Sequence, residues 1–458
     1  MMVKDLKKIY FLGIGGIGMS ALARFFHRRG AEIYGYDRTE TALTKKLVNE
    51  GMKIHYTEDT TQIPSGIDLV IYTPAIPKTN SELHFLKKIN CQIKKRAEVL
   101  GMISRTHRTI AVAGTHGKTT TSSLLTHILR VGGVDCTAFL GGIPKNYLSN
   151  YVEGNSDWVV VEADEYDRSF LHLHPDIAIL TSMDADHLDI YGDVKTMHES
   201  GFRAFVQNLK PGGHWYLQHQ LTENFDDFSP SGRPRTYGVD GGEIRAENVR
   251  VESGWFVFDI KRQTESARGT IIPDVRLSLP GRHNVENATA AAAVALQLGV
   301  SPEDIRRALA SFEGIERRFE WVHRDARTAL INDYAHHPTE LNAAISAARE
   351  LFPDRKLTGI FQPHLYTRTR DFQVGFAKAL DALDEVVLMD IYPAREAPLP
   401  GITSRVILDK MQNPNKVLAS KDNLINVLKD KDLEVVLMLG AGDIDTLVEP
   451  VKELLLNQ

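Results

Sequence analysis

The most informative run in this chain is Gly114-Thr115-His116-Gly117-Lys118-Thr119-Thr120. It follows residues 110–113, which predict a buried strand, and precedes residues 122–129, which predict a helix. Glycines in such a turn let backbone N–H groups approach an anion, and the helix N-terminus adds partial positive charge. Lys118 can then reach the outer phosphates of a nucleotide, and Thr119 can hold Mg²⁺. The run predicts a phosphate loop, shortened because Val112 stands where the usual pattern has its first glycine.

Composition limits the classes of function. A chain of 458 residues is too long for one hydrophobic core and predicts about two to four domains. The net charge of −5 argues against a nucleic-acid-binding protein. Two cysteines, Cys91 and Cys136, provide neither a disulfide framework nor a Cys-rich metal site. The sequence shows no signal peptide and no membrane-spanning stretch, so we expect a cytoplasmic protein that binds no membrane. We expect it to be a monomer or a homodimer.

The first segment, residues 1–107, begins with a second glycine turn. Its glycines are Gly13, Gly15, Gly16 and Gly18, between a predicted strand at 9–12 and a predicted helix at 19–29. Asp37 has the spacing of an acid that binds a ribose. The motif alone indicates a dinucleotide. The segment is short for a dinucleotide fold, however, and a nucleotide-sugar carries the same pyrophosphate, so UDP is an equal candidate for the helix N-terminus.

Acidic and histidine residues follow two predicted strands of the second segment, residues 108–320. Glu162-Ala163-Asp164-Glu165 comes directly after the predicted strand at 158–161, the position of a Mg²⁺-holding acid in nucleotide hydrolases. His187 follows the predicted strand at 177–180. It can ligate a second metal ion or orient a phosphate, or it can be purely structural.

Polar residues also mark the end of the second segment. His283 and Asn287 begin an alanine-rich predicted helix, where they can bind a ligand or simply cap the helix. Arg317 and Arg318 stand at the expected junction with the third segment. A guanidinium there can neutralise a transferring phosphate, or the pair can lie on the surface.

The third segment, residues 321–458, places further polar side chains after predicted strands. Tyr334 and His336 follow a strand at 329–333, and His364 and Arg368 follow a strand at 357–361. Carboxyl ends of parallel strands form the ligand crevice of an open α/β sheet. Arg368 can bind the carboxylate of a small zwitterion there, with His336 beside it.

The alternation of strands and helices predicts an α/β protein with parallel sheets. We expect three domains: an N-terminal Rossmann-like domain (1–107), a central phosphate-loop ATPase-like domain (108–320) and a C-terminal Rossmann-like domain (321–458). The central domain also contains β-like runs between about 214 and 280.

Taken in order, these runs resemble the Mur ligases of peptidoglycan synthesis. The resemblance covers nearly the whole chain and is carried by residues 13–20, 114–120, 162–167, 186–189, 283–287, 317–319, 333–340 and 362–371. It implies an ATP-dependent ligase with one domain for a UDP-sugar, one for ATP and one for an amino acid. It places Lys118 on the ATP phosphates, Thr119 and Glu162 on one Mg²⁺, and His187 on a second. His283, Asn287 and an arginine of the pair at 317–318 would lie around the nucleotide.

Two positions bear on the branch of the family. Later-acting ligases carry a carbamoylated lysine near Ser200, and this chain has no lysine there. That absence favours the branch that joins L-alanine to the lactyl carboxylate of UDP-N-acetylmuramate through an acyl phosphate. Leu365, conversely, stands where that branch often has an arginine. The open alternatives are a recycling ligase that adds a murein tripeptide to the same sugar, an NAD-dependent dehydrogenase and a non-catalytic nucleotide switch.

Overall fold

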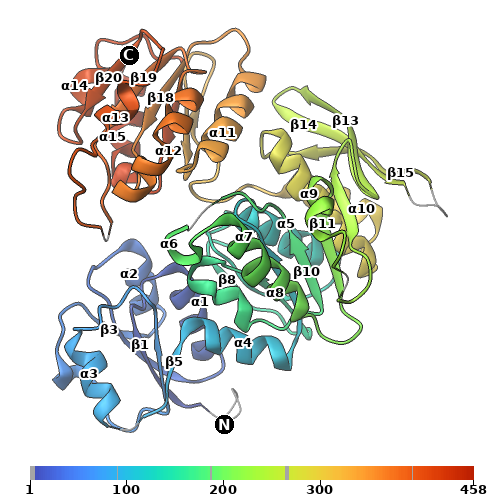
Figure 1. Cartoon of the computed structure of the whole chain (residues 1–458), viewed down its shortest axis with the longest axis vertical. Coiled ribbons are helices and arrows are strands. Elements are labelled where there is room, and N and C mark those ends of the chain that lie inside the picture. The colour runs from blue at the N-terminus through green and yellow to red at the C-terminus, as the bar shows by residue number, and fades with distance from the viewer. Residues whose placement is uncertain are drawn as a thin grey trace. The chain divides into compact units, whose positions relative to one another are not determined.

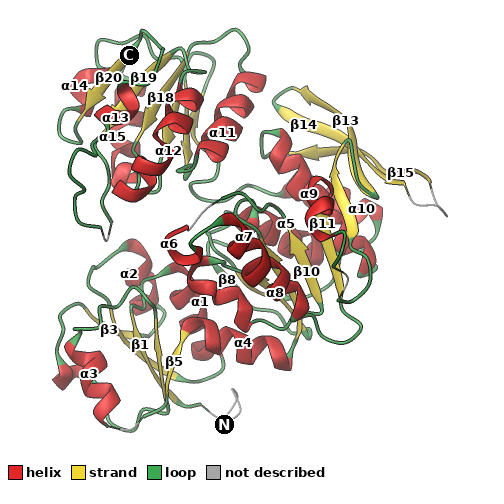
Figure 2. Ribbon diagram, viewed as in Figure 1, coloured by secondary structure: helices red, strands yellow, loops and turns green. Residues whose placement is uncertain are grey.

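A computed structural model describes residues 6–89, 91–185, 188–228, 230–263, 268–394 and 396–457. Within these ranges the strands form three sheets, with helices packed on them (Figure 1, Figure 2). The chain divides into two compact units. The first contains Met1–Glu247, Asp259–Val275 and Glu286–Phe312, and the second contains Asn248–Phe258, Arg276–Val285 and Glu313–Gln458. In the described part of the chain, no helix is both long enough and apolar enough to cross a bilayer.

The N-terminal part of the first unit is a parallel sheet in the order β3-β2-β1-β4-β5. Its strands are β1 (Lys8–Leu12), β2 (Glu32–Tyr36), β3 (Lys53–His55), β4 (Leu69–Tyr72) and β5 (Ile93–Lys95). Its helices are α1 (Ile17–Arg28), α2 (Ala42–Asn49), α3 (Ser81–Lys88) and α4 (Arg96–Thr106). The predicted glycine turn leads from β1 directly into α1, which begins two residues earlier than the apolar pattern indicates.

A larger sheet follows, in the order β15-β14-β13-β12-β11-β10-β6-β9-β7-β8. Its strands are β6 (Arg108–Ala113), β7 (Thr137–Phe139), β8 (Tyr151–Val152), β9 (Trp158–Glu162), β10 (Ile177–Leu180), β11 (His214–Gln218), β12 (Arg235–Val239), β13 (Ile244–Glu252), β14 (Trp255–Gln263) and β15 (Arg268–Leu277). The β-like runs after residue 214 therefore extend this sheet. Because β9 and β10 flank β6 in parallel, the loops after all three strands meet at one edge.

The helices of this region are α5 (Lys118–Val131), α6 (Leu188–Tyr191), α7 (Val194–Met197), α8 (Ala204–Gln207), α9 (Arg282–Gln297) and α10 (Pro302–Ser311). The phosphate-loop helix α5 starts four residues before the predicted helix, so that Lys118 is its first residue. One continuous apolar core joins the N-terminal sheet to the larger sheet, since Phe25 of α1 packs with Phe139 and Tyr151.

The second unit has a sheet in the order β16-β17-β21-β18-β19-β20, in which only the pairing of β16 with β17 is antiparallel among the described strands. Its strands are β16 (Glu320–Arg324), β17 (Ala329–Asp333), β18 (Leu357–Phe361), β19 (Glu385–Met389), β20 (Lys416–Ala419) and β21 (Val435–Leu439). Its helices are α11 (Pro338–Leu351), α12 (Tyr366–Leu380), α13 (Arg405–Leu408), α14 (Leu424–Leu428) and α15 (Val448–Leu456). The predicted three-domain α/β fold is confirmed.

Candidate active site

The phosphate loop connects β6 to α5 and has a backbone that only glycine adopts readily at two positions. Gly114 and Gly117 have φ angles of 139° and 79°. A Cβ atom on Gly114 would lie 2.1 Å from Thr181 Oγ1, and one on Gly117 would lie 2.6 Å from Asn287 Oδ1. The loop is thus a narrow turn at the N-terminus of a fourteen-residue helix, the geometry that binds phosphate groups.

The loop after β10 holds the phosphate loop in place. The backbone N–H of His116 donates to Ser182 Oγ at 2.7 Å, and that of Thr115 donates to Ser182 O at 3.2 Å. In return, the N–H of Asp184 donates to Thr115 Oγ1 at 3.0 Å. Thr181, Ser182 and Asp184 were not predicted as site residues. Their position directly after the predicted strand at 177–180 is the signal that identifies them.

Lys118 lies in a buried cluster of opposite charge. Its Nζ is 2.8 Å from Glu165 Oε2 and donates to the carbonyl oxygen of Gly114 at 2.7 Å. Burial opposes the charge of Lys118, but the carboxylates of Glu165, Asp164 and Glu162 outweigh burial and raise its pKa. Burial raises the pKa of Glu165 to about 7, although the charge of Lys118 limits that rise. The amine is therefore held charged beside the loop, ready to meet an anion.

Glu162, predicted to hold Mg²⁺, is the last residue of β9 and pairs across the sheet with Val112, two residues before the phosphate loop. Its Oε2 accepts the N–H of Gly141 at 3.1 Å. Thr119 is buried in the first turn of α5. Hydroxyl and carboxylate oxygens suit Mg²⁺, which takes its remaining ligands from phosphates and water. No group of three or more His, Cys, Asp or Glu side chains among the described residues forms a metal cluster, and His187 lies outside them.

Asn287 reaches the phosphate loop from helix α9. Thr121 Oγ1 donates to Asn287 Oδ1 at 3.1 Å, and the same oxygen faces Gly117. His283 stands four residues earlier on α9, which is the same face of a helix. The structure therefore brings Asn287 to the phosphate loop, whereas His283 is an exposed residue of the first turn of α9.

The first glycine turn has a different internal bond. The N–H of Gly15 donates to Asp37 Oδ2 at 2.8 Å, so the acid after β2 braces the turn. Gly13 has a φ of 84°, and Gly16 is the N-cap of α1. A Cβ on Gly18 would lie 2.6 Å from Nη1 of Arg96, so glycine lets this guanidinium lie against the first turn of α1.

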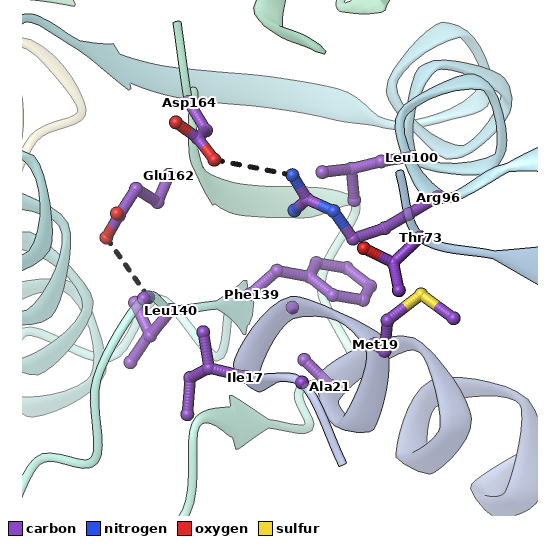
Figure 3. Close-up of a pocket in the computed structure, with 13 residues that line it drawn as sticks. Ile17, Met19, Ala21, Thr73, Arg96, Leu100, Phe139, Leu140, Glu162 and Asp164 are labelled. Atoms are coloured by element: carbon purple, nitrogen blue, oxygen red, sulfur yellow. Dashed lines mark hydrogen bonds and ion pairs between the residues drawn. The ribbon is translucent and has the colours of Figure 1, made fainter. Parts of the chain in front are cut away.

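A pocket of about 240 Å³ lies next to this turn and is enclosed by both parts of the first unit (Figure 3). Its lining residues are Gly16, Ile17, Gly18, Met19 and Ala21 of the first turn and α1, Thr73 after β4, Arg96 and Leu100 of α4, Phe139 at the end of β7 with Leu140 and Gly141 after it, Glu162 at the end of β9, and Asp164 after β9. Glu162 thus faces the pocket and also stands beside the phosphate loop. Two of the predicted substrate glycines, Gly16 and Gly18, therefore share one pocket with the predicted metal ligand Glu162.

Arg96, which was not predicted as a site residue, is the cation of this pocket. Its Nη2 lies 3.5 Å from Asp164 Oδ2. A dashed line marks this ion pair in Figure 3. Because the pocket lining also contains two carboxylates, an anionic ligand needs this guanidinium to offset their repulsion. Arg96 and Gly18 lie far apart in the sequence, so no local sequence pattern indicates that the two residues are neighbours.

In the second unit, the predicted residues Tyr334, His336 and His364 lie together. The ring centroids of Tyr334 and His336 are 5.2 Å apart, and those of His336 and His364 are 5.9 Å apart. His336 Nδ1 lies 2.8 Å from Tyr334 O and 3.3 Å from Glu340 Oε2. Glu340, which was not predicted as a site residue, therefore orients the imidazole.

Arg368 and the arginine pair have distinct surroundings in the second unit. Arg368 is buried in the first turn of α12, the helix after His364. Leu365, buried at the start of that helix, has a φ of 69°.

Arg317 donates to the carbonyl oxygens of Gly440 and Gly442 at 2.9 and 3.1 Å and pairs with Asp445. Arg318 lies 3.9 Å from Glu340 Oε1, and both guanidiniums lie over the ring of Tyr334.

Three family profiles match this chain. The profile described as "Mur ligase family, catalytic domain" matches residues 8–108, "Mur ligase middle domain" matches residues 112–295, and "Mur ligase, glutamate ligase domain" matches residues 317–442. The matches follow one another along the chain in the order of its three sheets.

Full-length relatives agree with the profiles. The chain is 47% identical over 465 residues to the UDP-N-acetylmuramate–L-alanine ligase of Christiangramia forsetii, with 100% of both chains covered. Its structure is similar to that of the UDP-N-acetylmuramate-alanine ligase from Thermotoga maritima, with a TM-score of 0.83, 30% identity, and coverage of 98% of this chain and 100% of that one. A murein peptide ligase from Psychrobacter arcticus has a TM-score of 0.72 at 24% identity, with 99% of both chains covered, and shares the fold.

Proposed function

The chain belongs to the Mur ligase family, and on this premise we propose that it joins L-alanine to the lactyl carboxylate of UDP-N-acetylmuramate, using ATP. The observation that carries the proposal is the pocket between the first glycine turn and Glu162. A sugar nucleotide with its pyrophosphate at α1 would extend toward the edge of the sheet that carries the phosphate loop. We assign the binding of the UDP-sugar to residues 1–107, of ATP to residues 108–320 and of the amino acid to residues 321–458. We also propose that the reaction takes place in the cytoplasm.

The reaction needs an activated carboxylate, because hydroxide is a poor leaving group and phosphate is a good one. The lactyl carboxylate attacks the γ-phosphate of ATP and displaces ADP, which gives an acyl phosphate. The amine of L-alanine then attacks the carbonyl carbon, and phosphate leaves from the tetrahedral intermediate. The phosphate loop and its Lys118 provide a site for phosphoryl transfer from ATP, so we place the activation of the carboxylate on ATP rather than on a covalent enzyme intermediate.

The residues of the phosphate loop stabilise the charge that develops during phosphoryl transfer. Lys118 is the fixed cation at the loop, and Arg96 holds the anionic sugar nucleotide at the pocket wall. Thr119 and Glu162 would hold Mg²⁺, which supplies further neutralisation of phosphate charge when bound. Of the arginine pair, we assign the phosphate contact to Arg318, because Arg317 is bonded to backbone carbonyls of its own unit.

The amino-acid site is assigned to Tyr334, His336, His364 and Arg368. The methyl side chain of alanine contributes only about 1 kcal/mol by transfer, so affinity must come from the charged ends of the zwitterion. His336 is the better candidate to accept a proton from the amine. Asp333, the other candidate, already accepts the N–H groups of Phe319 and Ala335 at 2.6 and 2.7 Å, and burial raises its pKa to about 6.

The recycling ligase is the second candidate, because a murein peptide ligase shares this fold. An assay of phosphate release distinguishes the two candidate activities. The enzyme is given ATP and UDP-N-acetylmuramate together with either L-alanine or the tripeptide L-alanyl-γ-D-glutamyl-diaminopimelate. We expect release with alanine and none above background with the tripeptide. With ¹⁸O in the lactyl carboxylate, the released phosphate should carry the label. Unlabelled phosphate would exclude the acyl phosphate.

A further inference from the structure

Asn150 is a fully buried amide that joins the two parts of the first unit. Its Nδ2 donates to Ile17 O and, at 3.0 Å, to Ser20 Oγ, both in the first turns of α1. Its Oδ1 accepts a hydrogen bond of 2.5 Å from Nη1 of Arg24, further along the same helix. Both donors and the acceptor of this side chain are therefore committed to a helix that lies more than a hundred residues earlier in the chain.

The backbone of Asn150 holds the opposite wall of the pocket. The N–H of Leu140 donates to Asn150 O at 2.9 Å. Leu140 and Ile17 both line the pocket that we assign to the sugar nucleotide, and they come from its two sides. One residue thus fixes the distance between the glycine turn and the segment after β7.

Glu50 completes the network behind Asn150. It lies 2.7 Å from Nη2 of Arg24 and 2.8 Å from Nε, a two-pronged ion pair that neutralises the buried guanidinium. Arg24 is only 5% exposed. Since its charge is already balanced, its remaining bond to Asn150 orients the amide, and the amide in turn presents its N–H groups to α1.

Other contacts also pack α1 against β7 and β8. Phe25 packs at ring-centroid distances of 5.3 Å from Phe139 and 6.3 Å from Tyr151, and Arg29 lies 3.7 Å above the Phe25 ring. The ring contacts are non-directional, and the hydrogen bond that Arg29 Nη1 donates to Tyr151 Oη at 3.2 Å lies at the far end of α1, so neither fixes the first turn of the helix at the pocket. A buried hydrogen-bonded amide fixes that turn because a shift would leave its polar atoms unpaired.

We propose that Asn150 is a positioning residue that sets the spacing of the pocket walls and thereby the affinity for the sugar nucleotide. The inference rests on the proposed function, since it names the ligand of this pocket. Donation from Nδ2 to the first turn of α1 is the contact that matters. It acts on the turn that faces the ligand, whereas the bond to Arg24 acts behind it.

The test compares Asn150→Ala and Asn150→Asp with a matched control, Asn155→Ala, on the full-length enzyme. Asn155 is an exposed asparagine of the same region, and its Nδ2 donates to Asp135 Oδ2 at 2.9 Å. Asn150→Asp keeps an acceptor for Arg24 but loses the donation to Ile17. We expect both Asn150 variants to raise the KM and Kd for UDP-N-acetylmuramate about tenfold. The KM for ATP and the turnover at saturation should stay near the wild-type values, and the control should match the wild type.

Three results overturn the proposal. Wild-type affinity for UDP-N-acetylmuramate in a folded Asn150→Ala protein would show that the amide does not set the pocket. Full affinity in Asn150→Asp would show that the bond to Arg24 carries the effect. Equal rises in the KM for ATP and for the sugar nucleotide would show general damage to the fold. If the wild type itself does not bind UDP-N-acetylmuramate in calorimetry, the proposed function fails, and that result is separate from all three.

Discussion

The two glycine turns of the first unit have the same order of elements, strand, turn and helix, and yet they differ in the charges around them. The turn before α1 is braced by a carboxylate, Asp37, and contains no basic residue of its own. The turn before α5 begins its helix with Lys118, which is held by the buried Glu165. In the first turn the cation, Arg96, comes from a different helix and lines a pocket.

The different source of the cation indicates that the first turn binds a ligand and that the second turn takes part in phosphoryl transfer. A turn whose cation comes from a neighbouring wall can hold a pyrophosphate that does not react. A turn whose own helix supplies a buried lysine, with acids at the end of the adjacent strand, can also neutralise a phosphoryl group in transfer. We therefore expect damage to the second turn to affect turnover and damage to the first to affect sugar-nucleotide affinity.

The largest effect is expected from Lys118→Ala. The variant should lose turnover by on the order of 10²-fold or more, because the lysine stabilises charge that develops mainly in the transition state. The Kd for UDP-N-acetylmuramate should not change. Steady-state kinetics and calorimetry measure the two quantities, with the exposed Lys195→Ala as the control. Turnover within tenfold of the wild type would mean that the second turn does not carry the chemistry.

Arg96→Ala should raise the KM for UDP-N-acetylmuramate by roughly tenfold to a hundredfold, the range for a lost hydrogen bond to a charged group. The KM for ATP should stay within about twofold, because Arg96 lines the sugar pocket and pairs with Asp164 rather than with a residue of the phosphate loop. Arg105→Ala is the matched control, since Arg105 is an exposed arginine at the other end of α4. An unchanged KM for the sugar nucleotide would contradict the proposed role of Arg96 in binding it.

Glu162→Ala should raise the Mg²⁺ concentration needed for half-maximal activity several-fold, because it removes one oxygen ligand beside the phosphate loop. Asp157→Ala is the control at the other end of β9. His187→Ala should act in the same direction if that residue holds a second ion. Magnesium titrations that overlay on the wild type for both variants would leave the metal roles without support.

The smallest effect concerns pH and Glu165. Burial raises the pKa of Glu165 to about 7 from its usual 4.5, so between these values the folded protein holds a proton that the unfolded chain releases. The contribution of this group to the free energy of unfolding therefore falls as the pH rises through that window. The stability difference between wild type and Glu165→Gln, from urea unfolding, should decline from about pH 5 to about pH 7.5. A difference that is constant with pH would contradict the raised pKa.

The sequence predicted most of the fold because its strands are short apolar runs that end in glycine turns or polar residues. β10 and two strands of the second unit, at 329–333 and 357–361, have the predicted bounds. The start of α5 was predicted too late, since Thr119 and Thr120 are polar and yet buried in its first turn. Apolar periodicity gives no signal where a helix buries hydroxyl groups.

The site was predicted less completely, for a similar reason. A run such as Glu162-Ala163-Asp164-Glu165 identifies the end of a strand but not the partner of each acid. In the structure Glu165 pairs with Lys118, Asp164 with Arg96, and Glu162 bonds to Gly141. Those pairings depend on strand order in the sheet and on the packing of α4 against α1, which no local pattern records. The roles of the predicted site residues in binding remain predictions.

Crossed binding measurements test the division between the two turns most directly. Calorimetry would give the Kd of UDP-N-acetylmuramate and of a non-hydrolysable ATP analogue for wild type, Lys118→Ala and Arg96→Ala. The account predicts that Arg96→Ala weakens only the sugar nucleotide and that Lys118→Ala, if it weakens either ligand, weakens only the ATP analogue. Loss of sugar-nucleotide binding in Lys118→Ala, or of ATP-analogue binding in Arg96→Ala, would contradict it.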